Sequence, residues 1–169
     1  MKIHRSKQSD IHDFRAFWDS AADYQRARRL PVWPAFPEER INDEMRAGLH
    51  FSARMPDGVV AGYFSVALSD ELIWGAEEQG DAIYIHRVCV NPERKGNNLA
   101  ASILEWARGY APSLGRKFIR MDTWADNKRL VNFYVDCGFH YIGDRQLGDV
   151  PELEPHYSNI KLALFQNSA

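Results

Sequence analysis

The chain has 169 residues, 45% of them hydrophobic and 26% charged, with a formal net charge of −2. This length and balance predict one globular domain, residues 1–169, with one hydrophobic core. The small charge excludes a general attraction to nucleic acid or to anionic membranes, and the sequence has no run of about 18 apolar residues that would span a membrane.

The first half of the sequence predicts a strand, two helices and a hairpin. Apolar side chains recur at helical spacing after residue 10, where Ser9 or Asp10 is a suitable N-cap. Pro37 is a suitable first residue for the second helix, and Gly48 is a suitable stop. A turn sequence at residues 56–58, between two apolar runs, indicates the hairpin. The elements predicted for this half are strands at residues 2–7, 49–55 and 59–68 and helices at residues 10–29 and 37–48.

The most strand-like stretch is residues 81–90, an almost continuous apolar run that fits a strand buried on both faces. Asn91 and Pro92 interrupt it, because proline donates no hydrogen bond to a sheet and disfavours helix in the residue before it. A polar, cationic turn follows, and from Leu99 apolar residues recur at helical spacing to near Pro112. Strand, turn and helix in this order can bind an anion, because the free N–H groups of a helix start attract phosphate.

The second half continues this alternation of strands and helices. The strands at residues 81–90 and 117–124 bracket a helix, so we expect them to be parallel. Asp126 or Asn127 is expected to cap the last helix, and Gly138 to end it. The remaining predicted elements are strands at residues 139–143 and 157–165, a polar loop at residues 70–80, and a helix at residues 127–138 with Leu130, Phe133, Tyr134 and Cys137 on its inner face.

Cys89 and Cys137 are the two cysteines of the chain, and both lie in apolar periodic segments. We interpret them as reduced thiols in the core of a cytoplasmic protein, because disulfides belong to oxidising compartments. The first residues also lack the apolar stretch of a secretory signal. His86 and Cys89 are spaced like a pair of metal ligands, but no second pair at such spacing accompanies them, so no metal is expected.

Two blocks of the sequence resemble the GNAT superfamily of N-acyltransferases. In the first block, Val90-Asn91-Pro92 matches the end of the family's acyl-CoA-binding strand, Lys95 falls on a cationic position and Ala100 on a small one. Asn98 replaces the family's central glycine, and asparagine tolerates left-handed backbone better than other non-glycine residues. The second block, residues 122–139, matches the family's Asn-to-Tyr-to-Gly-Phe pattern.

The resemblance implies a mixed α/β fold, a GNAT-like central mixed sheet of six to seven strands flanked by about four helices. It implies acetyl-CoA as cosubstrate. Main-chain groups of the strand end would pair with the pantetheine arm, and those of the next loop with the pyrophosphate, aided by cations. The alternative for this loop is an exposed run of charges. The residues implied in cofactor binding are Val88, Cys89, Val90, Arg94, Lys95, Gly96, Asn97, Asn98, Leu99, Ala100, Asn127 (as helix cap, pantetheine ligand or both) and Tyr134.

Two residues are candidates for proton transfer. By position, Tyr134 resembles the family's general acid, which protonates the departing CoA thiolate; the alternative is a core tyrosine with a satisfied hydroxyl. His86 lies where some family members hold a glutamate base. A neutral imidazole can take the proton of an attacking amine through water, and the alternative is a core histidine hydrogen-bonded to the backbone.

The resemblance therefore implies an N-acetyltransferase that acetylates a primary amine of a small molecule or peptide by direct attack. The alternative is a non-catalytic acyl-CoA sensor on the same fold, suggested by the missing central glycine. A structural domain without CoA is a third reading. A homodimer is possible, and neither nucleic acid nor membrane is an expected partner. Trp33, Trp74 and Trp124, in or beside predicted loops, either line an acceptor cleft or are partly buried.

Overall fold

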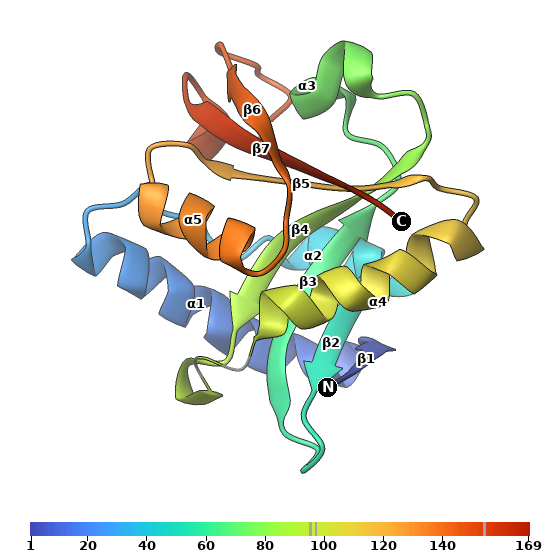
Figure 1. The fold of residues 1–169 in the computed structure, drawn as a ribbon. Helices are drawn as coiled ribbons and strands as arrows, with labels where there is room; N and C mark the ends of the chain where they lie inside the picture. The colour runs from blue at the N-terminus through green and yellow to red at the C-terminus, as the bar shows by residue number, and fades with distance from the viewer. Residues whose placement is uncertain (95, 97, 154) are drawn as a thin grey trace. The chain divides into compact units, whose positions relative to one another are not determined.

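The computed structural model describes residues 1–94, 96, 98–153 and 155–169, which form a mixed sheet and several helices (Figure 1). The strands follow the order β1-β2-β3-β4-β5-β7-β6. This seven-stranded α/β architecture confirms the predicted fold class. None of the described helices is long and apolar enough to cross a membrane. The strands are β1 (Lys2–Arg5), β2 (His50–Arg54), β3 (Val60–Ala67), β4 (Ala82–Val90), β5 (Phe118–Trp124), β6 (Tyr141–Gln146) and β7 (Lys161–Ser168), and the helices are α1 (Ile11–Ala27), α2 (Glu38–Arg46), α3 (Glu71–Trp74), α4 (Leu99–Ser113) and α5 (Lys128–Asp136).

The chain divides into two compact units, each made of two separate segments of the sequence. The first unit comprises Met1–Val66 and Arg87–Leu99, and the second comprises Ala67–His86 and Ala100–Ala169. The boundaries fall near the end of β3, inside β4 and at the first residue of α4. Each unit therefore takes part of β4 and is discontinuous in sequence.

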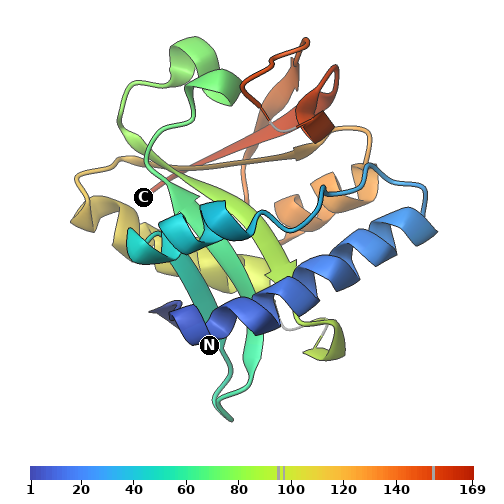
Figure 2. The same ribbon diagram turned by 180° about the vertical axis from the view of Figure 1, so that it is seen from behind.

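The first unit is an antiparallel meander with two helices on one face, as Figure 2 shows for α1 and α2. β1 pairs with β2, and β2 pairs with β3. The apolar stripes of the helices meet the strands in a core of large side chains, each of which stabilises the fold by about 1.5–3 kcal/mol when fully buried. The core residues of this cluster are Phe14, Trp18, Ile41, Met45, Tyr63 and Cys89.

The second unit contains a parallel strand pair that two antiparallel strands extend. Residues 82–85 of β4 pair in parallel with residues 118–121 of β5, which confirms the expected parallel arrangement. β7 pairs antiparallel with both β5 and β6. Helix α5 is fixed on this sheet through Tyr134, whose ring meets the rings of Phe139 and Phe165 edge to face.

A buried arginine of the second unit ties the segment before β4 to the sheet. Arg120, on β5, donates to the hydroxyl of Tyr84 at 2.8 Å and to the main-chain carbonyl of Glu77 at 2.9 Å. Its guanidinium also lies 4.8 Å from the centre of the Trp74 ring. These contacts satisfy a buried charge and hold α3 in place. They thereby fix Asp70, the N-cap residue of α3.

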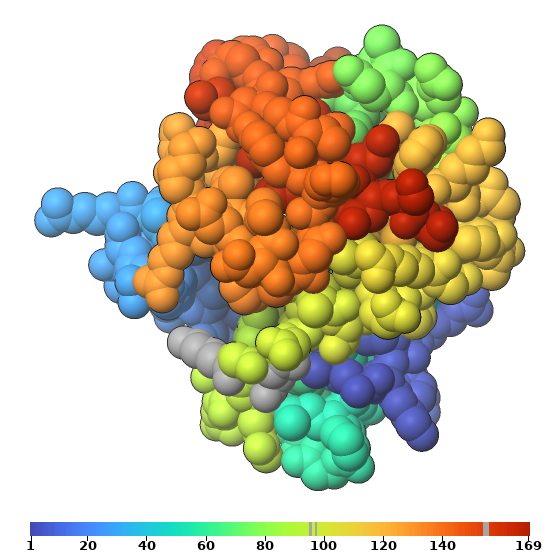
Figure 3. Space-filling view, viewed as in Figure 1, coloured from blue at the N-terminus to red at the C-terminus, as the bar shows by residue number. Residues whose placement is uncertain are grey.

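Three expectations about burial and local structure are wrong. Residues 70–80 are not a simple loop, because they contain α3 and a short 3₁₀ turn, and Trp74 is fully buried under Arg120 rather than placed in a cleft. Phe133 is 48% exposed, because α5 turns Val131 and Tyr134 inward instead. Figure 3 shows in orange the exposed side of α5 and of the segment that follows it.

Candidate active site

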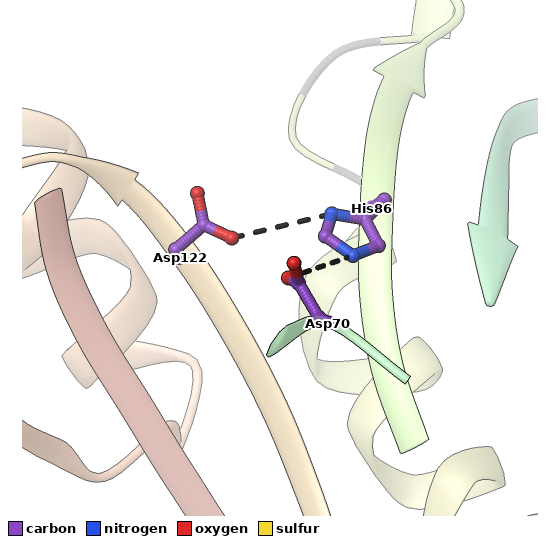
Figure 4. A group of neighbouring side chains, drawn as sticks. All are labelled: Asp70, His86 and Asp122. Carbon is purple, nitrogen blue, oxygen red and sulfur yellow. Dashed lines mark ion pairs between the residues drawn. The ribbon is translucent and has the colours of Figure 1, made fainter. Parts of the chain in front are cut away.

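His86, on β4, lies between two carboxylates of the second unit (Figure 4). Its Nε2 lies 3.3 Å from Oδ2 of Asp70, and its Nδ1 lies 4.0 Å from Oδ1 of Asp122. The side chains of His86, Asp70 and Asp122 are 17%, 10% and 5% exposed. The imidazole therefore faces carboxylates, in contrast to the alternative of a core histidine bonded to the backbone. Three ionisable groups this close and this buried form an acid–base cluster.

Burial changes the acidity of one carboxylate of this cluster, Asp122. Burial away from water raises the pKa of Asp122 from 3.8 to about 6; the charge of His86 opposes this rise and that of Asp70 adds to it. Asp122 is therefore mostly ionised at neutral pH and protonated in mild acid. Oδ1 of Asp122 and Oδ2 of Asp70 accept no hydrogen bond from any described residue. Since buried polar atoms are normally satisfied, these two oxygens have unused capacity to accept a donor.

The fold brings these three residues together from separate parts of the sequence. The parallel register ends with Ile85 opposite Met121, so His86 and Asp122 are the next residues on neighbouring strands. Asp70 precedes α3, and its main-chain N–H donates to a carboxylate oxygen of Glu78 at 3.0 Å. Neither aspartate is a site residue predicted from the sequence. The one available signal is an acidic residue in the predicted strand at residues 117–124.

The residue after His86 belongs to the first unit and has an unusual backbone conformation. Arg87 has a φ of 52°, in the left-handed region that costs an ordinary residue about 1–2 kcal/mol. Its guanidinium donates to Oε1 of Glu44 at 2.7 Å, and Oε2 of Glu44 accepts from the Ser65 hydroxyl at 2.5 Å. This partly buried ion pair anchors the Arg87 side chain to α2 within the first unit.

The predicted phosphate loop starts at a buried asparagine of the first unit. The Asn91 amide donates to the carbonyl of Val60 at 2.8 Å, and its oxygen accepts from the N–H of Glu93 at 2.9 Å. Gly96 and Asn98 follow with φ values of 83° and 53°. Asn98 thus adopts the left-handed conformation expected of it in place of glycine. Turns of this kind before a helix start expose main-chain N–H groups that bind anions.

The other predicted residues of this loop have different positions. Lys95 and Asn97 lie outside the described residues. Arg94 is exposed, and its guanidinium lies 3.6 Å from a carboxylate oxygen of Asp57. Leu99 and Ala100 are buried, as expected for the first turn of a helix with an inward apolar face.

The end of β4 approaches β3 very closely in the first unit. A Cβ added to Gly62 would lie 2.4 Å from the carbonyl oxygen of Cys89 and 2.4 Å from the side chain of Leu99. Only glycine fits at this point. Cys89 is a buried free thiol, whereas Val90 is 39% exposed, so the last part of β4 is less enclosed than the both-face burial predicted for it.

Tyr134 and Asn127 lie on or beside α5 in the second unit. Oδ1 of Asn127 accepts from the N–H of Leu130 at 3.2 Å, which confirms the predicted helix cap. Tyr134 is mostly buried, with its ring 5.6 Å from that of Phe139 and 5.9 Å from that of Phe165. The packing agrees with a core tyrosine, and the role of its hydroxyl as an acid stays a prediction.

Comparison with curated proteins finds one partial relative. Over 74 residues, the chain is 32% identical to the uncharacterized N-acetyltransferase YesJ of Bacillus subtilis (strain 168). The alignment covers 44% of this chain and 41% of that relative. The chain thus matches less than half of the length of the curated relative.

Several solved structures share the fold at low sequence identity. A GNAT-family acetyltransferase from Listeria monocytogenes matches with a TM-score of 0.73 and 18% identity over 99% of this chain and 94% of that chain. The yncA protein of Salmonella typhimurium, a putative acetyltransferase solved with acetyl-CoA, matches with a TM-score of 0.68 and 15% identity, covering 99% of this chain and 93% of that chain. A spermidine N-acetyltransferase from Vibrio cholerae, solved with CoA and spermine, matches with a TM-score of 0.66 and 13% identity, covering 99% of this chain and 94% of that chain. At these identities the likeness concerns the fold alone.

The family model supplies the assignment that low-identity structures cannot. The model of the acetyltransferase (GNAT) family matches residues 14–139. This range contains β4, the phosphate loop and α4, together with the second block of the resemblance. It also contains His86, Asp70 and Asp122. The chain therefore belongs to the GNAT acetyltransferase family.

Proposed function

We propose that the protein is an N-acetyltransferase that transfers the acetyl group of acetyl-CoA to a primary amine by direct attack. The observation that carries this proposal is the acid–base cluster of His86, Asp70 and Asp122 in a member of the GNAT family. Acylation of an amine requires a group that removes a proton from nitrogen. A module that only senses acyl-CoA has no need of one, so the catalytic function is favoured over the sensor.

Acetyl-CoA is the proposed donor, in keeping with the family and with the yncA structure described with this molecule. The pyrophosphate would bind to main-chain N–H groups of residues 95–100, where left-handed turns at Gly96 and Asn98 precede the long helix α4. Arg94 and Lys95 would add positive charge. Main-chain groups of Val88, Cys89 and Val90 would pair with the pantetheine arm, and Asn127 would assist.

In the proposed reaction, the neutral amine attacks the thioester carbonyl and a C–N bond forms. A backbone N–H near Val88 would polarise that carbonyl. His86 takes a proton from the attacking nitrogen, directly or through water. The C–S bond then breaks, and Tyr134 gives its proton to the leaving thiolate. The proton held by His86 finally restores the phenol through solvent, so the products are an N-acetyl amide and CoA thiol.

The proposed acceptor is a primary amine of a small molecule or a peptide. The Vibrio cholerae neighbour is described as a spermidine N-acetyltransferase in complex with CoA and spermine, so an amine acceptor is known on this fold.

We also propose that the protein acts in the cytoplasm as one functional domain. Free thiols at Cys89 and Cys137 suit a reducing compartment. A homodimer is a further expectation, which sedimentation velocity can test.

A coupled thiol-release assay tests the proposed function. Acetyl-CoA is offered with a panel of primary amines and short peptides, and the expected result is release of CoA thiol that depends on the acceptor. Binding of acetyl-CoA without acceptor-dependent release would favour the sensor. Absence of any thermal stabilisation by acetyl-CoA would favour a structural domain, because a ligand that binds only the native state must stabilise it.

Variants at Asn98 test the phosphate loop separately from catalysis. Asn98→Gly is expected to keep acetyl-CoA affinity, because glycine accepts the φ of 53°. Asn98→Val is expected to lower the affinity about tenfold or more, because a β-branched residue is strained in this region. Isothermal titration calorimetry measures both. Equal affinity of the two variants would show that this turn does not hold the cosubstrate.

A further inference from the structure

The acid–base cluster contains more negative charge than a proton acceptor needs. His86 alone can take a proton, yet Asp70 and Asp122 both face it. The side chain of Asp122 is 5% exposed, and Figure 4 shows one of its oxygens directed at the imidazole. That oxygen and Oδ2 of Asp70 accept no hydrogen bond from the described residues. Two buried and unsatisfied acceptors next to a histidine indicate that a cation with several N–H donors belongs between them.

The acceptor atoms lie close enough together for one cation to contact all three residues. One ring nitrogen of His86 and one oxygen from each aspartate all lie within 4.8 Å of one another. Acceptors about 2.9 Å from one ammonium nitrogen lie at most about 4.7 Å apart in a tetrahedral arrangement, so an ammonium group fits within this limit. A zinc ion about 2.1 Å from its ligands would hold them roughly 3.4 Å apart, which is closer than Nδ1 of His86 and Oδ1 of Asp122. The gap of 4.0 Å between Nδ1 of His86 and Oδ1 of Asp122 is too long for a hydrogen bond but admits a donor that bridges the two atoms.

We propose that Asp70, His86 and Asp122 form a subsite for the ammonium group of a positively charged primary amine. Its catalytic consequence rests on the proposed transfer reaction, whereas the binding itself does not. The substrate class is then an aliphatic amine that is protonated at neutral pH, selected over weakly basic amines that are neutral. Asp70 and His86 keep a part of their side chains exposed, which leaves the subsite accessible from solvent.

The subsite also explains how a protonated amine becomes a nucleophile. The ammonium group passes its first proton to the neutral imidazole of His86, and this frees the nitrogen lone pair. The imidazolium that forms lies 3.3 Å from Asp70, whose negative charge stabilises it until the proton leaves to solvent. The proton lost after C–N bond formation follows the same route. No oxidant, metal or further reactant is required.

Acetyl transfer to two amines of similar size measures how strongly the subsite selects a charged amine over a neutral one. Ethylamine is charged at neutral pH, and 2,2,2-trifluoroethylamine is largely neutral. Asp122→Asn and Asp70→Asn are each expected to lower kcat/KM for ethylamine about tenfold or more, mainly through KM, and to change that for trifluoroethylamine less than about threefold. Asp136→Asn, an exposed aspartate on α5 of the same unit, is the matched control and should change neither. Equal losses for both amines would overturn the proposal.

A binding experiment separates this proposal from the proposed reaction. The protein is labelled with ¹⁵N-histidine, and the NMR signals of the His86 ring are assigned by their loss in the His86→Gln variant. Addition of n-butylammonium is expected to shift these signals, whereas addition of n-butanol is not. The shift should persist in Asp136→Asn and be lost in Asp122→Asn. A shift without acetyl transfer would sustain the subsite and defeat the acetyltransferase. No shift with the ammonium ion, or a response only to ZnCl₂, would overturn the subsite.

Discussion

At the scale of single residues, Asp70 and Asp122 bring two negative charges into a site that is largely closed to water. A buried carboxylate loses hydration and needs a positive partner to remain ionised without cost. An imidazolium at His86 or a bound ammonium group supplies that partner. Ionised Asp122, which would attract a cationic substrate, therefore destabilises the protein when no cation is present.

The stability cost of Asp122 is expected to depend on pH. Its pKa in the folded protein is raised from 3.8 to about 6, so folding penalises the ionised form above pH 6. The penalty decreases as the pH falls through 6, and it vanishes below 3.8, where folded and unfolded chains are both protonated. Asp122→Asn should therefore stabilise the protein at about pH 8, by at most roughly 2–3 kcal/mol, and have little effect near pH 4.

Urea unfolding of the wild type and Asp122→Asn at both pH values measures this difference. Asp136→Asn serves as the control, since that side chain is exposed and its removal should give no comparable pH-dependent gain. A stability difference between wild type and Asp122→Asn that is the same at both pH values would show that burial does not shift the carboxyl group.

Tyr134→Phe is expected to lower kcat roughly 100-fold, in the range that loss of a general acid produces. The ring contacts with Phe139 and Phe165 remain in this variant, so the melting temperature should change little. Acetyl-CoA affinity, measured by calorimetry, should stay within about twofold. A large loss of affinity with unchanged turnover would assign the hydroxyl to binding and leave the thiolate without this acid.

The role of a single residue could be predicted from the sequence only where its neighbours along the chain determine that role. Asn127 caps α5 and Asn98 is left-handed as expected, because capping and backbone preference are local properties. The two aspartates beside His86 could not be predicted in the same way. Asp122 reaches the histidine through the parallel register of β4 and β5, and Asp70 through the folding of α3, and neither is encoded in the spacing of residues.

At the scale of elements, the close approach of β3 and the end of β4 gives a sharp test. Gly62→Ala would place a methyl group 2.4 Å from the carbonyl oxygen of Cys89 and from a carbon of Leu99. Since backbone on one side cannot move freely, the variant should lose about 1–3 kcal/mol of stability in urea unfolding. Gly109→Ala, with nothing within 4 Å and an exposed helical position, should instead gain up to about 1 kcal/mol. Equal effects would show that the contact is not rigid.

Element type and order were predictable because periodicity of apolar residues reports on them directly. Two details were not. The segment at residues 70–80 reads as polar, and its helix exists because Arg120 binds the Glu77 carbonyl and covers Trp74, which are contacts distant in sequence. On α5, Phe133 and Tyr134 are adjacent apolar residues, and packing on Phe165 selects Tyr134 for the inside.

At the scale of the whole molecule, the two compact units do not correspond to two stretches of sequence. Residues 82–86 of β4 belong to the second unit, and residues 87–90 of the same strand belong to the first. A unit that shares a strand with its neighbour cannot unfold without breaking the pairing of that strand. We therefore predict that the chain unfolds as one cooperative system.

Native-state hydrogen exchange tests this prediction by its response to a single variant. Gly62 lies in the first unit, and β7 lies wholly in the second. If unfolding is cooperative, Gly62→Ala should lower the opening free energy of the slowest amides of β2 and of β7 by the same amount, equal to its loss of global stability. Gly109→Ala should raise both equally. A decrease confined to β2 would mean that the first unit opens alone, and residues 1–169 would then behave as two domains rather than one.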